Sequence, residues 1–108
     1  MTTETKHGIF TQKKIDKIES VVCEYNGETP ERIKEKCRLR SIVLSRHIIF
    51  FLLRKHTLLT LNEIAHYYGL KDHSTVIHGI KALEDRMFSE PFLKKQVSQM
   101  SLLVKYSN

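Results

Sequence analysis

Residues 61–80, LNEIAHYYGLKDHSTVIHGI, decide the fold of this chain because they predict two short helices joined by a turn. The TLNE at residues 60–63 is a capping box, in which the threonine and glutamate side chains satisfy free backbone amides at a helix start. Gly69 can take the left-handed conformation that ends this first helix. A second helix begins near Asp72, so residues 61–88 have the form of a helix-turn-helix unit.

The second helix of this unit opens with polar side chains and keeps an apolar face behind them. The polar residues are Asp72, His73, Ser74 and Thr75, and the apolar residues are Val76, Ile77, Ile80, Leu83 and Met87. His78 follows Ser74 by four residues and Thr75 by three, so these three side chains share one surface. Such a pattern is typical of a helix whose N-terminal turn enters a DNA major groove.

The residues around the start of this helix have separate expected roles. Asp72 can cap the helix by accepting from the amides of Ser74 or Thr75, or it can accept from a cytosine amino group, and capping is favoured. Lys71 lies just before the helix, where the helix dipole also attracts anions, so we expect it to contact a phosphate. Gly79 costs about 1 kcal/mol in mid-helix, which indicates a close approach, more readily to a neighbouring helix than to DNA.

The net charge is concentrated in one segment of the chain. Residues 36–62 contain no Asp or Glu and six cations, namely Lys36, Arg38, Arg40, Arg46, Arg54 and Lys55, with His47 and His56 beside them. These six equal the formal net charge of +6, since the rest of the chain is balanced with twelve basic and twelve acidic residues. The sequence therefore predicts a cationic patch on one surface, suited to phosphate contact.

Length and composition limit the classes of protein that this chain can be. With 108 residues it should form a single domain, and its longest apolar run, residues 48–53, is too short to cross a bilayer. The N-terminus lacks the features of a signal peptide, so we expect a cytoplasmic protein without membrane association. Cys23 and Cys37 match no closed zinc pattern even with His73 and His78, and we predict no metal and no cofactor.

The same polar residues do not favour catalysis. Asp72, His73, Ser74 and His78 include the residue types of a hydrolase, but adjacent helical residues point about 100° apart and no nucleophile elbow is present. The chain also lacks the GxxxxGK[ST] phosphate loop, so no nucleotide is expected to bind. The sequence thus predicts a protein that is not an enzyme.

The remaining segments predict further helices. Residues 1–10 should be a flexible leader, and residues 11–108 a single all-α domain. The first predicted helix ends near residues 26–27 and turns Ile15, Ile18, Val22 and Tyr25 inward. A short helix should span residues 30–35 and a buried helix residues 41–56. A last amphipathic helix should carry Leu93, Val97, Met100 and Val104 on its apolar face. Residues 36–40 should be an extended basic loop. Arg40, His47 and Arg54 recur every seven residues, either to meet phosphates or as a solvated edge.

Residues 15–86 resemble the C-terminal DNA-binding domain of the bacterial replication initiator DnaA. The most specific part is KDHSTVIH at residues 71–78, and the Leu, Glu and Ile of LNEI at residues 61–64 also match. The resemblance implies an all-helical, Trp-repressor-like domain that binds double-stranded DNA at short A/T-rich sites called DnaA boxes. It also implies that Arg38 reaches into the minor groove, that Asp72, His73, Ser74, Thr75 and His78 face the major groove, and that Arg46, His47, Arg54 and Lys71 lie at or near the DNA backbone.

Two other functions compete with this reading of the sequence. One is a helix-turn-helix regulator of transcription or of a mobile element, with a different target site. The other is a protein-interaction module that uses residues 92–104 as a partner-binding helix. The chain also departs from the family pattern, since Leu70 stands where a second glycine is usual and His47 where a glutamine is common.

Overall fold

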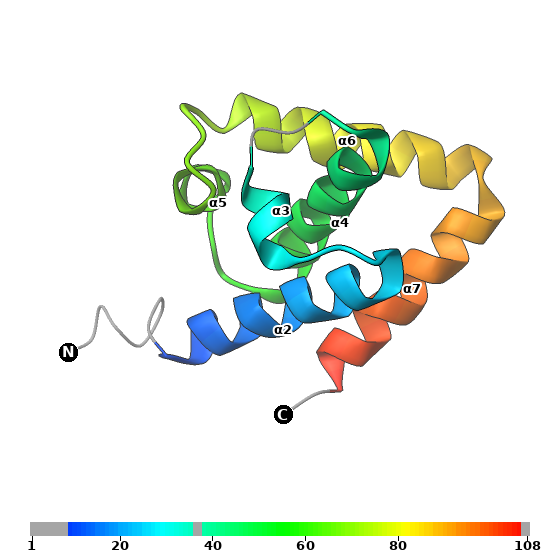
Figure 1. The fold of residues 1–108 in the computed structure, drawn as a ribbon, viewed down its shortest axis with the longest axis horizontal. Helices are drawn as coiled ribbons and strands as arrows, with labels where there is room; N and C mark the ends of the chain where they lie inside the picture. Colours follow the sequence, from blue (N-terminus) through cyan, green and yellow to red (C-terminus); the bar gives the residue numbers. More distant parts are fainter. Residues whose placement is uncertain (1–8, 36–37, 107–108) are drawn as a thin grey trace.

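The computed structural model describes residues 9–35 and 38–106, which form six helices and, over that part of the chain, no strand (Figure 1). The helices are α2 (Ile9–Asn26), α3 (Pro30–Lys34), α4 (Arg40–His56), α5 (Leu61–Tyr67), α6 (Ser74–Ser89) and α7 (Pro91–Lys105). The predicted all-α class is confirmed. None of these helices is long and apolar enough to cross a membrane.

The observed helix ends differ little from those that the sequence predicts. α2 begins at Ile9, two residues before the predicted start, and the rest of the predicted leader lies outside the described residues. It ends at Asn26, where Gly27 takes the expected left-handed conformation with φ 70°. Thr29 caps α3 by accepting from the amide of Arg32 at 3.3 Å. Tyr25 is 40% exposed, so the inward stripe of α2 is one residue shorter than predicted.

α4 is the central helix and contacts every other helix that the structure describes. α2 and α6 pack on it from opposite sides and do not touch each other within the described residues (Figure 1). Its fully buried apolar side chains are Ile42, Ile48, Ile49, Phe50, Leu52 and Leu53. Each contributes about 1.5–3 kcal/mol on burial, so the apolar pattern of residues 41–56 accounts for the central position of this helix.

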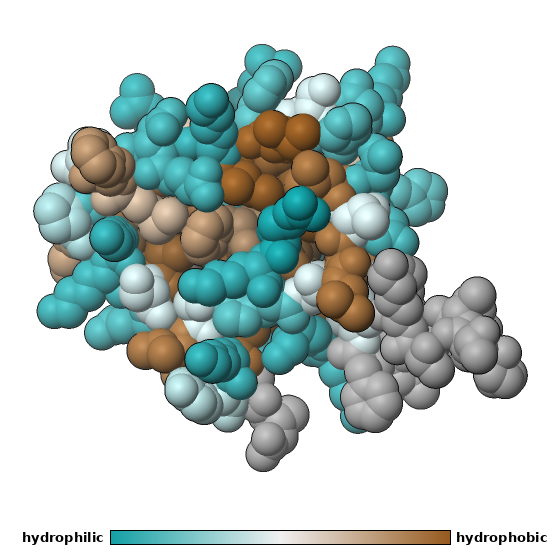
Figure 2. Space-filling model, turned by 180° about the vertical axis from the view of Figure 1, so that it is seen from behind, coloured by the Kyte–Doolittle hydropathy of each residue, from teal (hydrophilic) through white to brown (hydrophobic). Residues whose placement is uncertain are grey.

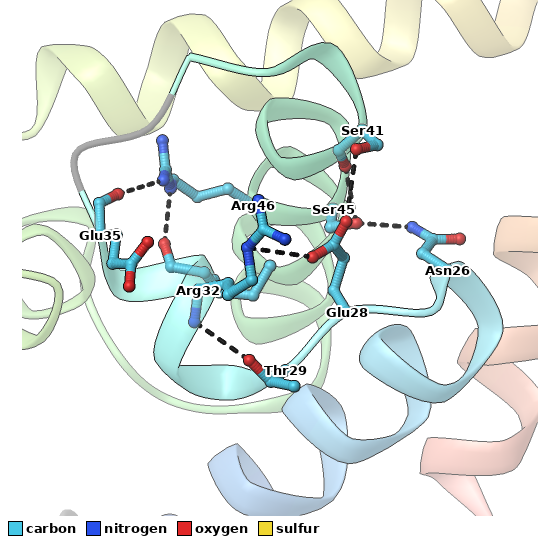
Figure 3. A network of polar contacts seen from close by, with 9 residues as sticks. Asn26, Glu28, Thr29, Arg32, Glu35, Ser41, Ser45 and Arg46 are labelled. Carbon is cyan, nitrogen blue, oxygen red and sulfur yellow. Dashed lines mark hydrogen bonds and ion pairs between the residues drawn. The ribbon is translucent and has the colours of Figure 1, made fainter.

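A chain of polar contacts fixes the N-terminal end of α4 (Figure 3). Asn26 donates to the hydroxyl of Ser45 at 2.7 Å, and that hydroxyl donates to the carbonyl of Ser41 at 2.8 Å. Ser41 in turn donates to the Glu28 carboxylate at 3.3 Å, and Arg32 lies 3.8 Å from the same carboxylate. The end of α2, the start of α3 and the first turn of α4 are thereby held together.

The C-terminal helix α7 packs along α2, α4 and α6. Its inward side chains Leu93, Val97, Met100 and Val104 are buried, as the sequence predicts. His56 at the end of α4 joins this packing, because its Nε2 lies 2.8 Å from the Ser101 hydroxyl.

This histidine gives the fold a dependence on pH. Burial, and then the charges of Lys55, Lys14 and Lys105, lower the pKa of His56 below the usual 6.5. The unfolded chain therefore takes up the proton first, so the free energy of unfolding should fall as the pH drops from about 7 to 5. Urea unfolding at several pH values measures this loss. His56→Gln should remove part of it, and an unchanged pH dependence in that variant would contradict the assignment.

Candidate nucleic-acid interface

Hydrogen bonds to backbone groups fix both ends of α5 and the turn that leads into α6. The capping box predicted for residues 60–63 is present: Thr60 accepts from the amide of Glu63, and Glu63 accepts from that of Thr60. At the other end of α5, Gly69 has φ 71°, and the amides of Gly69 and Leu70 donate to His66 and Ala65 at 3.0 and 2.8 Å. This bonding is a Schellman motif, which sets the direction in which α6 begins.

The first two turns of α6 present three polar side chains to solvent. Ser74, Thr75 and His78 are exposed, while Val76 and Gly79 are buried against α4. Asp72 is exposed and caps the helix by accepting from the Ser74 amide at 2.8 Å, which confirms the favoured alternative. Lys71 is exposed beside it.

One predicted inward residue of α6 lies outside the core. Ile77 is 38% exposed, although the sequence pattern placed it on the apolar face. Successive helical residues are about 100° apart, so the residue that follows the fully buried Val76 is turned away from α4.

His73 lies at the junction of the two helices. It is half-buried, immediately precedes α6, and its Nδ1 is 3.0 Å from Oδ1 of Asn62 in the first turn of α5. The side chain of His73 is therefore attached to the other helix of the helix-turn-helix unit.

Cations lie along one side of α6 at the N-terminal end of α4. Arg38 and Arg40 line a cleft with Ala82 and Arg86 of α6. Ala82 and Arg86 follow Thr75 by seven and eleven residues, so all three lie on the same side of the helix. Arg38 therefore faces the side of α6 that carries Thr75, about two turns, or about 10 Å, further along.

The opposite side of α6 has its own cations. Arg54, near the C-terminal end of α4, lines a groove with Lys81 of α6. The apolar lining of this groove is Leu61, Ile77 and Ile80, and Glu84 and Asp85 of α6 line it as well. Figure 2 shows apolar surface within a hydrophilic surround on the upper part of the molecule, where α6 runs. The exposed face of α6 is thus flanked by cations on both sides.

Arg46 has partners inside the fold. Its Nε donates to the carbonyl of Ile33 at 2.9 Å, and one terminal nitrogen donates to that of Glu35 at 2.7 Å (Figure 3). Ile33 and Glu35 lie at the C-terminal end of α3, so the two hydrogen bonds from Arg46 hold α3 against α4 just before the basic loop begins. Its predicted phosphate contact would have to use the remaining guanidinium nitrogen.

The predicted patch of six cations is not a single surface. Lys55 lies over the ring of Phe51 and lines a groove with Lys94 and Val97 of α7, away from the start of α6. Arg46 is bound to α3, and Lys36 lies outside the described residues. The cations of the described segment that flank α6 are Arg38, Arg40 and Arg54.

His47 packs at the point where α4 crosses α6. A Cβ atom added to Gly79 would lie 2.7 Å from Cδ2 of His47, so this glycine makes room for the imidazole ring. The close approach predicted for Gly79 is therefore to a neighbouring helix. Burial, and then the charge of Arg46, lower the pKa of His47 and favour its neutral form. A phosphate contact by this ring stays a prediction.

We expect Gly79→Ala to reduce the free energy of unfolding by about 1–3 kcal/mol, because the methyl group overlaps the His47 ring. The better helix propensity of alanine, worth about 1 kcal/mol, offsets part of this loss. In a His47→Ala background the clash is absent, and the same substitution should be neutral or stabilising. Urea unfolding of the four proteins measures the coupling, and equal effects in both backgrounds would contradict it.

Three residues near the candidate interface were missing from the predicted site. Lys81 follows Ser74 by seven residues, so the helical repeat places both on the same side of α6 and would have predicted Lys81 near the interface. Arg40 was predicted in the extended basic loop and, with His47 and Arg54, either to meet phosphates or as a solvated edge; it is the first residue of α4. Asn62 contacts His73 across a turn, and no local pattern in the sequence indicates that contact.

The fold and this site define a helix-turn-helix DNA-binding domain. The family model of the bacterial DnaA protein helix-turn-helix matches residues 15–83. The chain belongs to this family.

Similar full-length proteins are chromosomal replication initiator proteins DnaA. One from Campylobacter jejuni is 31% identical over 93 residues, covering 84% of this chain and 21% of that protein. Those from Campylobacter concisus and Oleidesulfovibrio alaskensis are 39% and 41% identical over 83 residues, covering 77% of this chain and 19% and 18% of theirs. The chain spans about a fifth of the length of the curated relatives it matches.

Proposed function

We propose that this chain binds double-stranded DNA sequence-specifically, at A/T-rich sites of the DnaA-box type, in replication initiation or its regulation. One observation carries the proposal: α6 exposes Ser74, Thr75 and His78 in its first turns and is flanked further along by arginines, with Arg38 and Arg40 beside Ala82 and Arg86 on one side and Arg54 beside Ile77 and Lys81 on the other. The relatives, by their names, initiate chromosomal replication, and that process is the context we infer for this domain.

The arrangement suits a major groove. An α-helix with its side chains is about 10–12 Å wide and the groove is about 12 Å wide, so α6 can enter it with its N-terminal turn. Phosphates line both edges of the groove, where Arg40 on one side and Arg54 and Lys81 on the other would face them.

Acidic residues limit how far along α6 the DNA can extend. Glu84 and Asp85 are exposed in the third turn, and Arg86 is paired with Glu90 through two hydrogen bonds of 2.9 and 3.0 Å. Glu84 and Asp85 line the groove on the Arg54 side, so on that side we expect phosphate contacts to end near Lys81, whereas Arg38 and Arg40 lie on the other side of α6.

Within this arrangement we assign roles to the predicted residues. Arg38 would enter an adjacent minor groove, where a narrow A/T-rich groove has an enhanced negative potential. The assigned base-facing residues are His73, Ser74, Thr75 and His78, with Asp72 capping the helix. The assigned backbone contacts are Arg54 and Lys71, with a smaller contribution from Arg46 and His47.

Selection from a random duplex library tests this function. The protein is immobilised, bound duplexes are recovered through several rounds, and the pool is sequenced. We expect one short, asymmetric, A/T-rich sequence to be enriched. A different enriched sequence would favour the alternative of a regulator with another target, and a pool without enrichment would remove sequence-specific binding altogether.

A second candidate function is protein interaction through α7. The outer face of this helix exposes Phe92, Leu103 and Tyr106 by 72%, 49% and 73%, and it lies beyond the residues that match the family model. If this face binds a second copy, light scattering should show a dimer that Leu103→Lys converts to a monomer. A monomeric parent protein would leave no support for self-association.

A further inference from the structure

We propose that Asn62 is a positioning residue that sets the tautomer of His73, so that the ring offers a hydrogen-bond acceptor to a base. The inference rests on the proposed DNA binding and deepens it. It assigns to His73 a preference for bases that carry an exocyclic amino group in the major groove.

The contact that carries this inference joins the two helices of the helix-turn-helix unit. Oδ1 of Asn62, in the first turn of α5, lies 3.0 Å from Nδ1 of His73 at the start of α6. A carboxamide oxygen can only accept a hydrogen bond, so Nδ1 must carry the hydrogen. A neutral imidazole has one N–H group, and Nε2 is therefore left with its lone pair.

Two restraints hold this ring in place. The backbone at His73 is fixed because Asp72 bonds the next amide, that of Ser74, at 2.8 Å. The ring is fixed because Nδ1 is held by Asn62. Nε2 is the ring nitrogen that Asn62 does not hold, and the residues next in the chain, Ser74 and Thr75, are exposed. A side chain restrained in this way loses little freedom when it meets a base.

The lone pair of Nε2 determines which bases His73 can contact. In the major groove, adenine and cytosine offer amino hydrogens, whereas guanine offers the acceptors N7 and O6. An acceptor nitrogen can bond to the first two and is repelled by the third. We therefore expect His73 to prefer adenine or cytosine over guanine or thymine at one position of the site, by about fivefold to tenfold, as one hydrogen bond gives.

The tautomer is tested on the free protein by long-range ¹H–¹⁵N NMR, because the two ring nitrogens have different shifts in each neutral tautomer. The wild type is expected to carry the hydrogen on Nδ1. Asn62→Asp, whose carboxylate also accepts, should keep this tautomer, and Asn62→Leu should lose the preference. A wild-type ring with the hydrogen on Nε2 would overturn the inference, since Asn62 would then be the donor.

The base preference is tested with Asn62→Leu on a set of duplexes that vary the selected site one base pair at a time. Discrimination should fall about fivefold to tenfold at a single base pair, while affinity for a scrambled duplex stays unchanged. Gln99→Leu on α7, an exposed amide whose hydrogen-bond partner is Tyr25 of α2, is the matched control and should leave base discrimination unchanged.

The two measurements distinguish a failure of the positioning role of Asn62 from a failure of the proposed DNA binding. Loss of the tautomer in Asn62→Leu without a change in base preference would refute the inference and leave sequence-specific binding standing. Wild-type protein without any base preference would refute the proposed function and the base-selecting role together, and NMR would still decide the tautomer.

Discussion

Replacing Arg38 with alanine is expected to lower the affinity for an A/T-rich site by about tenfold to a hundredfold and to weaken the preference for A/T pairs. Arg38 is exposed, lies two residues before the start of α4, and lines the cleft beside α6. A guanidinium in a narrow minor groove is favoured by the strong negative potential there, so its removal should cost more on A/T-rich DNA than on other sequences. Fluorescence anisotropy with matched A/T-rich and G/C-substituted duplexes measures both effects.

Lys71→Ala is the matched control for this prediction. Lys71 is exposed beside the start of α6, and a phosphate contact carries no sequence information. Its loss should reduce affinity about equally on all duplexes and make binding less sensitive to salt. If Arg38→Ala behaves in the same uniform way, the minor-groove role of Arg38 is wrong.

Tyr68→Phe is expected to reduce the free energy of unfolding by about 1–3 kcal/mol, because the buried Glu19 side chain loses a hydrogen-bond donor. The Tyr68 hydroxyl, at the end of α5, donates to Glu19 of α2 at 2.5 Å, and Glu19 is only 4% exposed. Burial, and then the nearby Glu19, raise the pKa of Tyr68, so the phenol stays protonated as the donor. Without it the Glu19 carboxylate would be buried with its hydrogen bond lost. Urea and thermal unfolding measure the loss.

Two further variants test the cause of this loss. Tyr106→Phe changes a tyrosine that is 73% exposed and should leave stability within about 0.5 kcal/mol of the parent. Adding Glu19→Leu to Tyr68→Phe removes the buried carboxylate and should recover part of the stability. Full stability in Tyr68→Phe alone would show that the hydroxyl is not needed.

Structural features that depend on residues close together in the chain could be predicted from the sequence. The capping box at residues 60–63, the left-handed Gly69 and the cap supplied by Asp72 all formed as predicted. Each involves groups within a few residues of one another, so the local chain determines it. The apolar repeat of residues 41–56 likewise predicted the central helix, because a helix that is apolar on nearly all sides must be buried.

The roles of side chains that depend on packing between helices could not be predicted from the sequence. Arg40, His47 and Arg54 lie along one edge of α4 at a seven-residue repeat, and this spacing alone predicts the same environment for all three. α6 crosses α4 over the middle of that edge, so His47 is packed against Gly79 while the two arginines are exposed at either side. Arg46 and Asn62 also have partners on other helices, which no sequence repeat indicates.

The most direct test of DNA recognition by α6 and its flanking arginines is anisotropy with a DnaA-box duplex and a scrambled duplex of the same composition, across a salt series. We expect the box duplex to bind at least about a hundredfold more tightly. With about five phosphate contacts, both affinities should fall on the order of a thousandfold between 50 and 200 mM salt. Equal affinity for the two duplexes at every salt concentration would contradict sequence recognition by this face.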